Sequence, residues 1–383
     1  MRFHRVASAL ACLLFLAAAA AGCGGSGNGG SGSASVSDRP APPAKDFPSA
    51  KGKTLAEVLN STNGPAQVVV SPAAQVFYKG PNRYSFGVFT LGQKQVPDAQ
   101  VALYFAKVPP SQETTLPSAA GATGASGATG GSGPSGASGS VGATGTTGSS
   151  KPPTKAEPRA LDEPATGQFP ARIESLVTEP AFRALTTAND PSAATAVYVT
   201  NVNFPSNGEW RIAAVIRDKN GTTATLLPSA IVGQFKRVPR AGQRPPKIHT
   251  PTPASVGGDL SKLTTRVPPE TMNQVDFADA LGKKPIVLLF ATPQFCQSRV
   301  CGPVVDVAEQ VRQQTGDAAD FIHMEIYNDN DPSKGPRPQV RAFNLPSEPW
   351  LFVIDRQGII RTAIEGAFGI NELEQAVKGV TGG

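Results

Sequence analysis

The chain has 383 residues, 39% hydrophobic and 17% charged, with 40 glycines and 36 prolines. This composition leaves room for two domains of ordinary size plus linkers and excludes a uniformly disordered chain. The net charge of +6 comes from 35 basic and 29 acidic residues. The basic residues are scattered and are not interleaved with aromatic ones, so we expect no nucleic acid as a partner.

The first 22 residues have the pattern of a secretory signal. A basic start at residues 2–5 precedes an apolar run at 6–21 that is too short for a membrane span. The small residues before Cys23 resemble a bacterial lipobox, although Ala20 stands where leucine is usual. We therefore expect residues 1–22 to be a lipoprotein signal peptide and Cys23 to carry the lipid that anchors the chain to the outer side of the cell membrane. The alternative is an ordinary secretory signal with Cys23 left free.

The region 47–239 reads as an antiparallel β domain. It begins with an amphipathic helix at 53–60, and Asp218–Gly221 has the composition of a hairpin turn. The expected strands lie at 67–71, 75–78, 83–90, 100–107, 194–202, 209–217 and 229–235. Short strands at this spacing predict a β-sandwich, with Trp210 in its core. The overall pattern resembles the small immunoglobulin-like domains of extracytoplasmic bacterial proteins.

Three segments of low complexity separate or interrupt the folded regions. We expect a flexible tether at 23–46, an insertion in the β domain at 110–160 and a Pro-rich linker at 240–260. Within the insertion, residues 121–148 carry glycine at every third position, which is the collagen period. A trimerising triple helix is one interpretation. A disordered loop is the favoured one, because the run holds a single proline, Pro134, and both of its ends return to the same domain.

From residue 261 to 383 the pattern changes to alternating strands and helices, which predicts an α/β domain. Expected helices lie at 273–281, 303–315 and 371–380, and expected strands at 285–291, 321–327, 350–355 and 359–364. The run 285–291 is apolar throughout, as in a strand that is buried on both faces.

Only two cysteines remain once Cys12 leaves with the signal peptide and Cys23 carries lipid. These two, Cys296 and Cys301, lie in an oxidising compartment and can pair only with each other or with an external partner. Residues i and i+5 of a regular helix are too far apart for a disulfide. Cys296 must therefore sit in the loop before the helix and fold back to Cys301.

Three local features carry a resemblance to the thioredoxin fold, closest to TlpA-like extracytoplasmic thiol-disulfide oxidoreductases. A strand ends just before the cysteines, Cys301-Gly302-Pro303 repeats the start of the thioredoxin motif, and Glu348-Pro349 precedes a strand. The resemblance covers residues 260–383. It implies that Cys296, Cys301 and Pro349 form the catalytic site, that protein thiols or disulfides are the substrates, and that no cofactor is needed.

The start of a helix suits thiol chemistry. The helix N-terminus offers free N–H groups and partial positive charge, which stabilise a thiolate, and Arg299 could add to that charge. The spacing of four residues between the cysteines leaves the nucleophile undecided, with a slight preference for Cys296 because it lies nearer the strand end.

Two other functions remain open. One is a copper-handling module similar to Sco-type chaperones, with His323 as the candidate ligand beside the two thiolates; a histidine on a buried strand is more often a packed core residue. The other is a non-catalytic thioredoxin-like binding domain with a structural disulfide. Near the second strand, Glu325, Asp329, Asn330 and Asp331 form an acidic cluster that we interpret as a solvated loop. We expect no metal site there.

Overall fold

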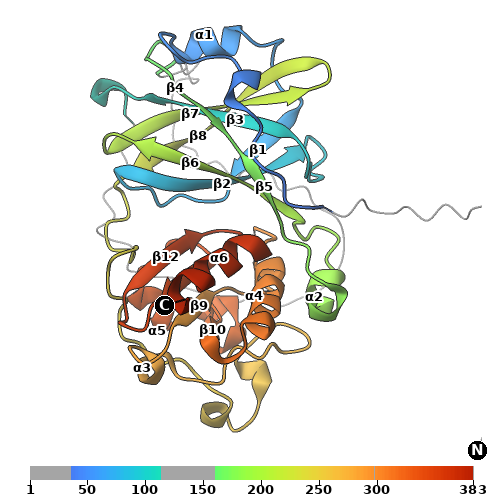
Figure 1. The fold of residues 1–383 in the computed structure, drawn as a ribbon, viewed down its shortest axis with the longest axis vertical. Helices are drawn as coiled ribbons and strands as arrows, with labels where there is room; N and C mark the ends of the chain where they lie inside the picture. Colours follow the sequence, from blue (N-terminus) through green and yellow to red (C-terminus); the bar gives the residue numbers. More distant parts are fainter. Residues whose placement is uncertain (1–35, 114–159, 297, 383) are drawn as a thin grey trace, which may run out of the picture. The chain divides into compact units, whose positions relative to one another are not determined.

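The computed structural model describes residues 36–113, 160–296 and 298–382 (Figure 1). The predicted signal peptide, the lipidation site Cys23 and the glycine repeat at 121–148 lie outside the described residues. These described residues group into one compact unit. Within the described ranges, no helix combines the length and the apolar character that crossing a membrane requires.

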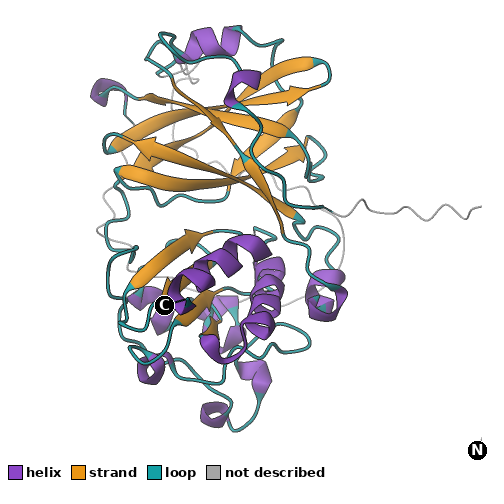
Figure 2. Ribbon diagram, viewed as in Figure 1, coloured by secondary structure: helices purple, strands orange, loops and turns teal. Residues whose placement is uncertain are grey.

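Two four-stranded antiparallel sheets make up the N-terminal part of this unit (Figure 2). One sheet has the order β1 (Val68–Pro72), β2 (Gly80–Thr90), β6 (Ala196–Phe204) and β5 (Arg172–Ser175). The other has the order β4 (Thr166–Pro170), β3 (Gln100–Lys107), β7 (Gly208–Asp218) and β8 (Gly221–Val232). Side chains of both sheets, such as Phe86 and Tyr198 from one and Phe105 and Trp210 from the other, form one hydrophobic core.

Most of the strands predicted for this region are present, with three differences. Residues 75–78 are not a strand and contribute only an isolated bridge between Phe77 and Val232. Strand β8 begins at Gly221, the last residue of the predicted hairpin turn, instead of at residue 229. Strands β4 and β5 were not expected from the sequence. The immunoglobulin-like character of the two sheets stays a prediction.

Helix α1 (Leu55–Asn60) forms where the sequence predicts it, because Thr54 and Glu57 make a capping box at its start. Part of the predicted tether is attached to the sheets: Arg39 exchanges two backbone hydrogen bonds with Ile173 of β5. The tether prediction is therefore too long at its C-terminal end.

A third sheet of four strands lies in the C-terminal part. Its order is β10 (Asp320–Met324), β9 (Ile286–Phe290), β11 (Trp350–Ile354) and β12 (Ile360–Glu365). Strand β10 runs parallel to β9, whereas β11 is antiparallel to both of its neighbours. The helices of this part are α3 (Phe277–Ala280), α4 (Cys301–Thr315), α5 (Pro338–Ala342) and α6 (Ile370–Thr381). Compared with the prediction, α3 is shorter and α5 is additional.

Strand β9 is buried on both faces, as its apolar run predicts. Val287 and Leu289 pack with residues of α4 and α6 on one face. Ile286, Leu288 and Phe290 pack on the other face with aromatic residues that include Phe277 of α3. Successive side chains of a strand point to opposite faces, so an unbroken apolar run is what a central strand between two cores requires.

The N-terminal sheets and helix α4 share a core. Val197 and Val199 of β6 belong to the same buried cluster as Cys301 and Val304 of α4. The connection between β5 and β6, which contains α2 (Leu185–Ala188), reaches the cysteine loop, since the Ala194 N–H donates to the Arg299 carbonyl at 3.0 Å.

The predicted linker is packed against the third sheet. The Gly242 N–H donates to the Ile360 carbonyl, and the Ile360 N–H donates to the Gln243 carbonyl, at 2.8 and 2.9 Å. Ile248 is buried, and the His249 side chain is 78% exposed with Nδ1 2.6 Å from Asp276 Oδ2. The linker therefore follows the edge strand β12 instead of spanning open solvent.

The packing of β11 in the core can be tested by replacing a buried leucine and an exposed leucine with alanine. Leu351 of β11 is fully buried, whereas Leu91 is 68% exposed. We expect Leu351→Ala to lower the free energy of unfolding by about 2–5 kcal/mol, because it leaves a cavity. Leu91→Ala should change it by no more than about 0.5 kcal/mol. Urea unfolding followed by circular dichroism measures both, and equal effects would contradict the placement of β11 in the core.

Candidate functional site

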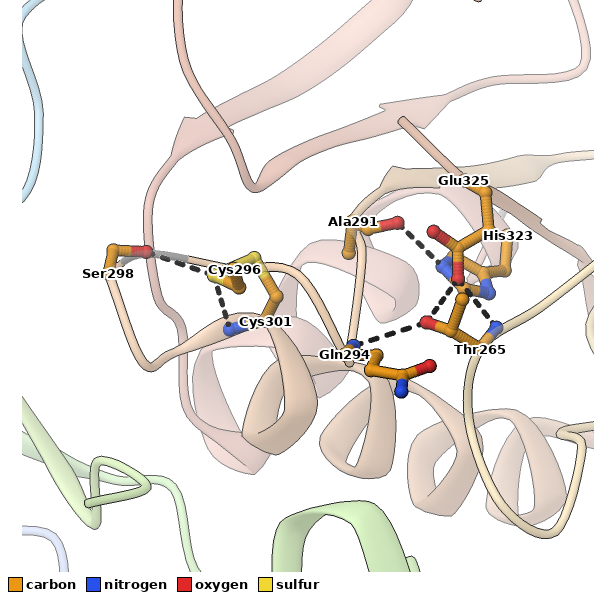
Figure 3. Close-up of a disulfide and its surroundings, with 8 residues drawn as sticks. All are labelled: Thr265, Ala291, Gln294, Cys296, Ser298, Cys301, His323 and Glu325. Carbon is orange, nitrogen blue, oxygen red and sulfur yellow. Dashed lines mark hydrogen bonds between the residues drawn. A yellow bond between two sulfur atoms is a disulfide. The ribbon is translucent and has the colours of Figure 1, made fainter. Parts of the chain in front are cut away.

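Cys296 and Cys301 form a disulfide at the point where the chain passes from β9 to α4 (Figure 3). Their Cα atoms are 5.8 Å apart, within the usual range for a disulfide. Cys301 is the first residue of α4 and is fully buried. Cys296 lies in the preceding loop and is only partly buried. One sulfur therefore lies nearer the surface and the other lies in the core.

The Cys296 sulfur lies at the N-terminus of α4. The cap residue Val300 gives no side-chain hydrogen bond to the helix, and the first N–H groups of a helix need a partner. The Cys301 N–H meets this need by donating to Cys296 Sγ at 3.3 Å, and Ser298 Oγ lies 3.1 Å from the same sulfur. A negative charge on Cys296 would therefore face one N–H group, one hydroxyl and the positive end of the helix dipole.

Arg299 contributes to the structure of the site through its backbone, and the effect of its charge on a thiolate stays a prediction. Its side chain is exposed, and its backbone has a left-handed φ of 63°. Its carbonyl accepts the hydrogen bond from Ala194 in the β5–β6 connection. The contact that Arg299 makes here comes from its main chain, and it fixes the turn between the two cysteines.

Pro349 lies at the same end of the sheet as the cysteine loop. The Glu348–Pro349 peptide bond is cis. Trp350 pairs with Phe290, the last residue of β9, so Pro349 comes next to the point where the chain leaves β9 for the cysteines. The Pro349 carbonyl accepts the Gly366 N–H at 2.9 Å, which ties this loop to the end of β12.

Three side chains to which the sequence assigned no role lie at this end of the sheet. The ring of Phe295, next to Cys296, meets the ring of Tyr327 edge-on, with 6.5 Å between centroids. Burial raises the pKa of Glu348. Burial also raises the pKa of Tyr327, and the charge of Glu348 adds to that rise. Their positions in the sequence offered a signal. Phe295 precedes Cys296, Glu348 precedes Pro349, and Tyr327 is the last residue of the predicted strand 321–327.

A buried ion pair lies under the cysteine loop. His323 of β10 and Glu270 have fully buried side chains, and His323 Nδ1 is 2.6 Å from Glu270 Oε1. The other ring nitrogen, Nε2, is 3.1 Å from the Ala291 carbonyl oxygen. Both nitrogens thus face acceptor oxygens, which suits an imidazolium with two N–H donors beside an ionised carboxylate.

The pKa values of this pair move in opposite directions. Burial alone would lower the pKa of His323, but the charge and hydrogen bond of Glu270, followed by the charge of Glu325, raise it. Burial alone would raise the pKa of Glu270, but the charge and hydrogen bond of His323 and a hydrogen bond from Thr264 lower it to about 2. His323 is thus a packed core residue, as one of the two readings of the sequence held.

The acidic cluster is a solvated loop only in part. Glu325 is fully buried, and its Oε1 accepts hydrogen bonds from the N–H and the hydroxyl of Thr265, both at 2.7 Å. Asp329, by contrast, is 76% exposed and pairs with Lys334. The prediction is wrong for Glu325, because Thr265, far away in the sequence, binds its carboxylate just after the end of β10.

The described residues contain no group of three or more histidine, cysteine, aspartate or glutamate side chains placed to hold a metal ion. His323, the candidate copper ligand, has both ring nitrogens engaged by Glu270 and Ala291. It could ligate a metal only after one of these contacts breaks.

The Glu270–His323 pair predicts a defined dependence of stability on pH. The lowered pKa of Glu270 means that its contribution is present above the ordinary value of 4.5 and is lost as the pH falls toward about 2. The raised pKa of His323 means that its contribution is complete below 6.5 and is lost as the pH rises through the folded value. The free energy of unfolding of the wild type should therefore exceed that of Glu270→Gln most between pH 4.5 and 6.5, by on the order of 3 kcal/mol.

Unfolding measured across the pH range checks this, with Asp329→Asn at an exposed site as the control. That control should leave the curve unchanged. A difference between wild type and Glu270→Gln that stays constant with pH would contradict the ion pair.

No family model and no curated protein matches this chain. Among solved structures, one that matches is a DsbF homologue from Corynebacterium diphtheriae, at 18% sequence identity and a TM-score of 0.24. The match covers 28% of this chain and 79% of that chain. A likeness at this score is too weak to carry a conclusion, and the assignment of a function rests on the residues of this chain.

Proposed function

We propose that the chain is a thiol-disulfide oxidoreductase that acts through Cys296 and Cys301, held at the outer side of the cell membrane by a lipid on Cys23. The observation that carries the proposal is the unequal placement of the two sulfurs. Cys296 is partly exposed and its sulfur accepts the first N–H of α4, whereas Cys301 is fully buried. An exchanging pair needs one sulfur that a partner can reach and one that completes the reaction inside the protein.

The reaction starts at Cys296 in either direction. With the chain oxidised, a substrate thiolate attacks Cys296 Sγ, a mixed disulfide forms and Cys301 leaves as a thiolate that takes up a proton. A second thiolate of the same substrate then attacks the substrate sulfur that is bonded to Cys296, and Cys296 leaves as a thiolate. The substrate has lost two electrons and holds a disulfide, and the chain has gained two electrons and holds two reduced cysteines. With the chain reduced, the same steps run in reverse.

The leaving thiolate at Cys296 is the species that the site stabilises. The Cys301 N–H, the Ser298 hydroxyl and the N-terminus of α4 all lie beside this sulfur. A thiol with such neighbours is more acidic than a free cysteine and is a better leaving group. The loop at Pro349, at the same end of the sheet, is the proposed place for an extended segment of a protein substrate.

The two alternatives have less support. A copper site would need His323, whose ring nitrogens are both engaged. A structural disulfide between residues five apart closes a very short loop, which constrains the unfolded chain less than a long loop would.

The reduction potential of the Cys296–Cys301 couple tests the proposal. We expect a value above about −300 mV, because structural disulfides in secreted proteins have lower values. The full chain is equilibrated with glutathione buffers, and the free thiols are alkylated and quantified by mass spectrometry. A potential well below about −300 mV would reject the exchange function and favour a structural bond.

A further inference from the structure

The four residues Ala291–Gln294 carry the chain from the end of β9 into the cysteine loop. Cys296 follows two residues later, so the position of its sulfur at α4 depends on where this segment lies. Figure 3 shows that two side chains of the neighbouring strand region, His323 and Glu325, lie beside the segment. His323 belongs to β10, and Glu325 is the first residue after that strand.

His323 holds the first residue of the segment. Its Nε2 lies 3.1 Å from the Ala291 carbonyl oxygen, and Glu270 at Nδ1 keeps the ring in place at 2.6 Å. Glu270 is itself fixed by Thr264 Oγ1 at 2.7 Å and by Asn273 Nδ2 at 2.9 Å. The donor at Nε2 is thus directed at Ala291 by a chain of buried hydrogen bonds.

Glu325 holds the last residue of the segment through Thr265. The Thr265 hydroxyl donates to Glu325 Oε1 at 2.7 Å and accepts the Gln294 N–H at 3.1 Å. One hydroxyl therefore joins a buried carboxylate to the backbone two residues before Cys296. The Thr265 N–H also donates to Glu325 Oε1 at 2.7 Å, which fixes the position of that hydroxyl.

Stability alone does not account for these buried groups. Glu325 Oε2 is buried without a hydrogen-bond partner among the described residues, and an unpaired buried oxygen destabilises a protein. Buried ion pairs are often no more stabilising than apolar side chains of the same volume. The charge of Arg337 also acts on Glu325: burial lowers the pKa of Arg337, and the charges of Glu325 and Asp329 raise it in part.

We propose that His323 and Glu325 are positioning residues of the Cys296–Cys301 couple, each fixing one end of the segment Ala291–Gln294 so that the Cys296 sulfur lies at the N-terminus of α4. The use of this positioning in disulfide exchange rests on the proposed function, whereas the positioning itself is inferred from the contacts alone. It predicts that a change at Thr265, which touches neither sulfur in the structure, alters the reactivity of Cys296.

The test compares two changes at Thr265 in the full chain. Thr265→Val keeps the shape of the side chain and removes the hydroxyl, and Thr265→Ser keeps the hydroxyl. The reduced protein is treated with iodoacetamide at neutral pH, and peptide mass spectrometry gives the rate at Cys296 separately from the other cysteines. We expect Thr265→Val to react about tenfold more slowly than wild type, and Thr265→Ser to react at the wild-type rate.

A second pair of variants addresses the other end of the segment. His323→Gln keeps a donor for the Ala291 carbonyl and should retain more of the reactivity of Cys296 than His323→Leu, which keeps none. The thermal unfolding of every variant is recorded, since a purely structural role would change stability and leave the rate at Cys296 unchanged.

The outcomes separate the two proposals. If folded Thr265→Val reacts at the wild-type rate, the positioning role is wrong, whatever the chain does with its disulfide. If Cys296 of the wild type reacts no faster than the thiol of a short unstructured peptide, the proposed function fails, and the two Thr265 variants still decide the positioning role.

Discussion

The hydrogen bond from the Cys301 N–H to Cys296 Sγ is the contact on which the site depends. It takes the place of the missing side-chain cap of α4, so one interaction both satisfies an N–H at the helix N-terminus and holds the Cys296 sulfur there. This hydrogen bond requires a helix that follows a buried strand, and a loop between the two that turns back toward the start of the helix. The four residues between the cysteines supply that loop, and Arg299, with its left-handed backbone conformation, lies in its turn.

The surroundings of this contact are supplied by distant parts of the chain. The β5–β6 connection of the N-terminal sheets binds the Arg299 carbonyl through Ala194, and Val197 and Val199 of β6 pack with Cys301. From the other side, His323 and Glu325 are bonded to the segment that leads to Cys296. The site is thus built between a shared apolar core and a small buried network of charges.

The sequence predicts the parts of this arrangement that follow from local periodicity. The unbroken apolar run at 285–291 predicts a buried strand, and the structure has β9 there, in the middle of the sheet. The spacing of the cysteines predicts a loop that folds back before the helix, and Cys296 lies in such a loop. The burial of Glu325 could not be predicted, because it depends on Thr265, far away in the sequence, which binds its carboxylate just after the end of β10. Strands β4 and β5 were missed for a similar reason: they are short, and their pairing with β3 and β6 is what makes them strands. The role of Thr265 has no local pattern at all.

Trapping of a mixed disulfide tests whether Cys296 is the cysteine that exchanges. The full chain carrying Cys301→Ser is mixed with an oxidised peptide that holds one disulfide, and the products are separated without reductant. We expect a covalent adduct at Cys296, and no adduct at Cys301 when the chain carries Cys296→Ser instead. An adduct that forms equally at either cysteine, or at neither, would contradict the proposal that Cys296 is the cysteine that exchanges.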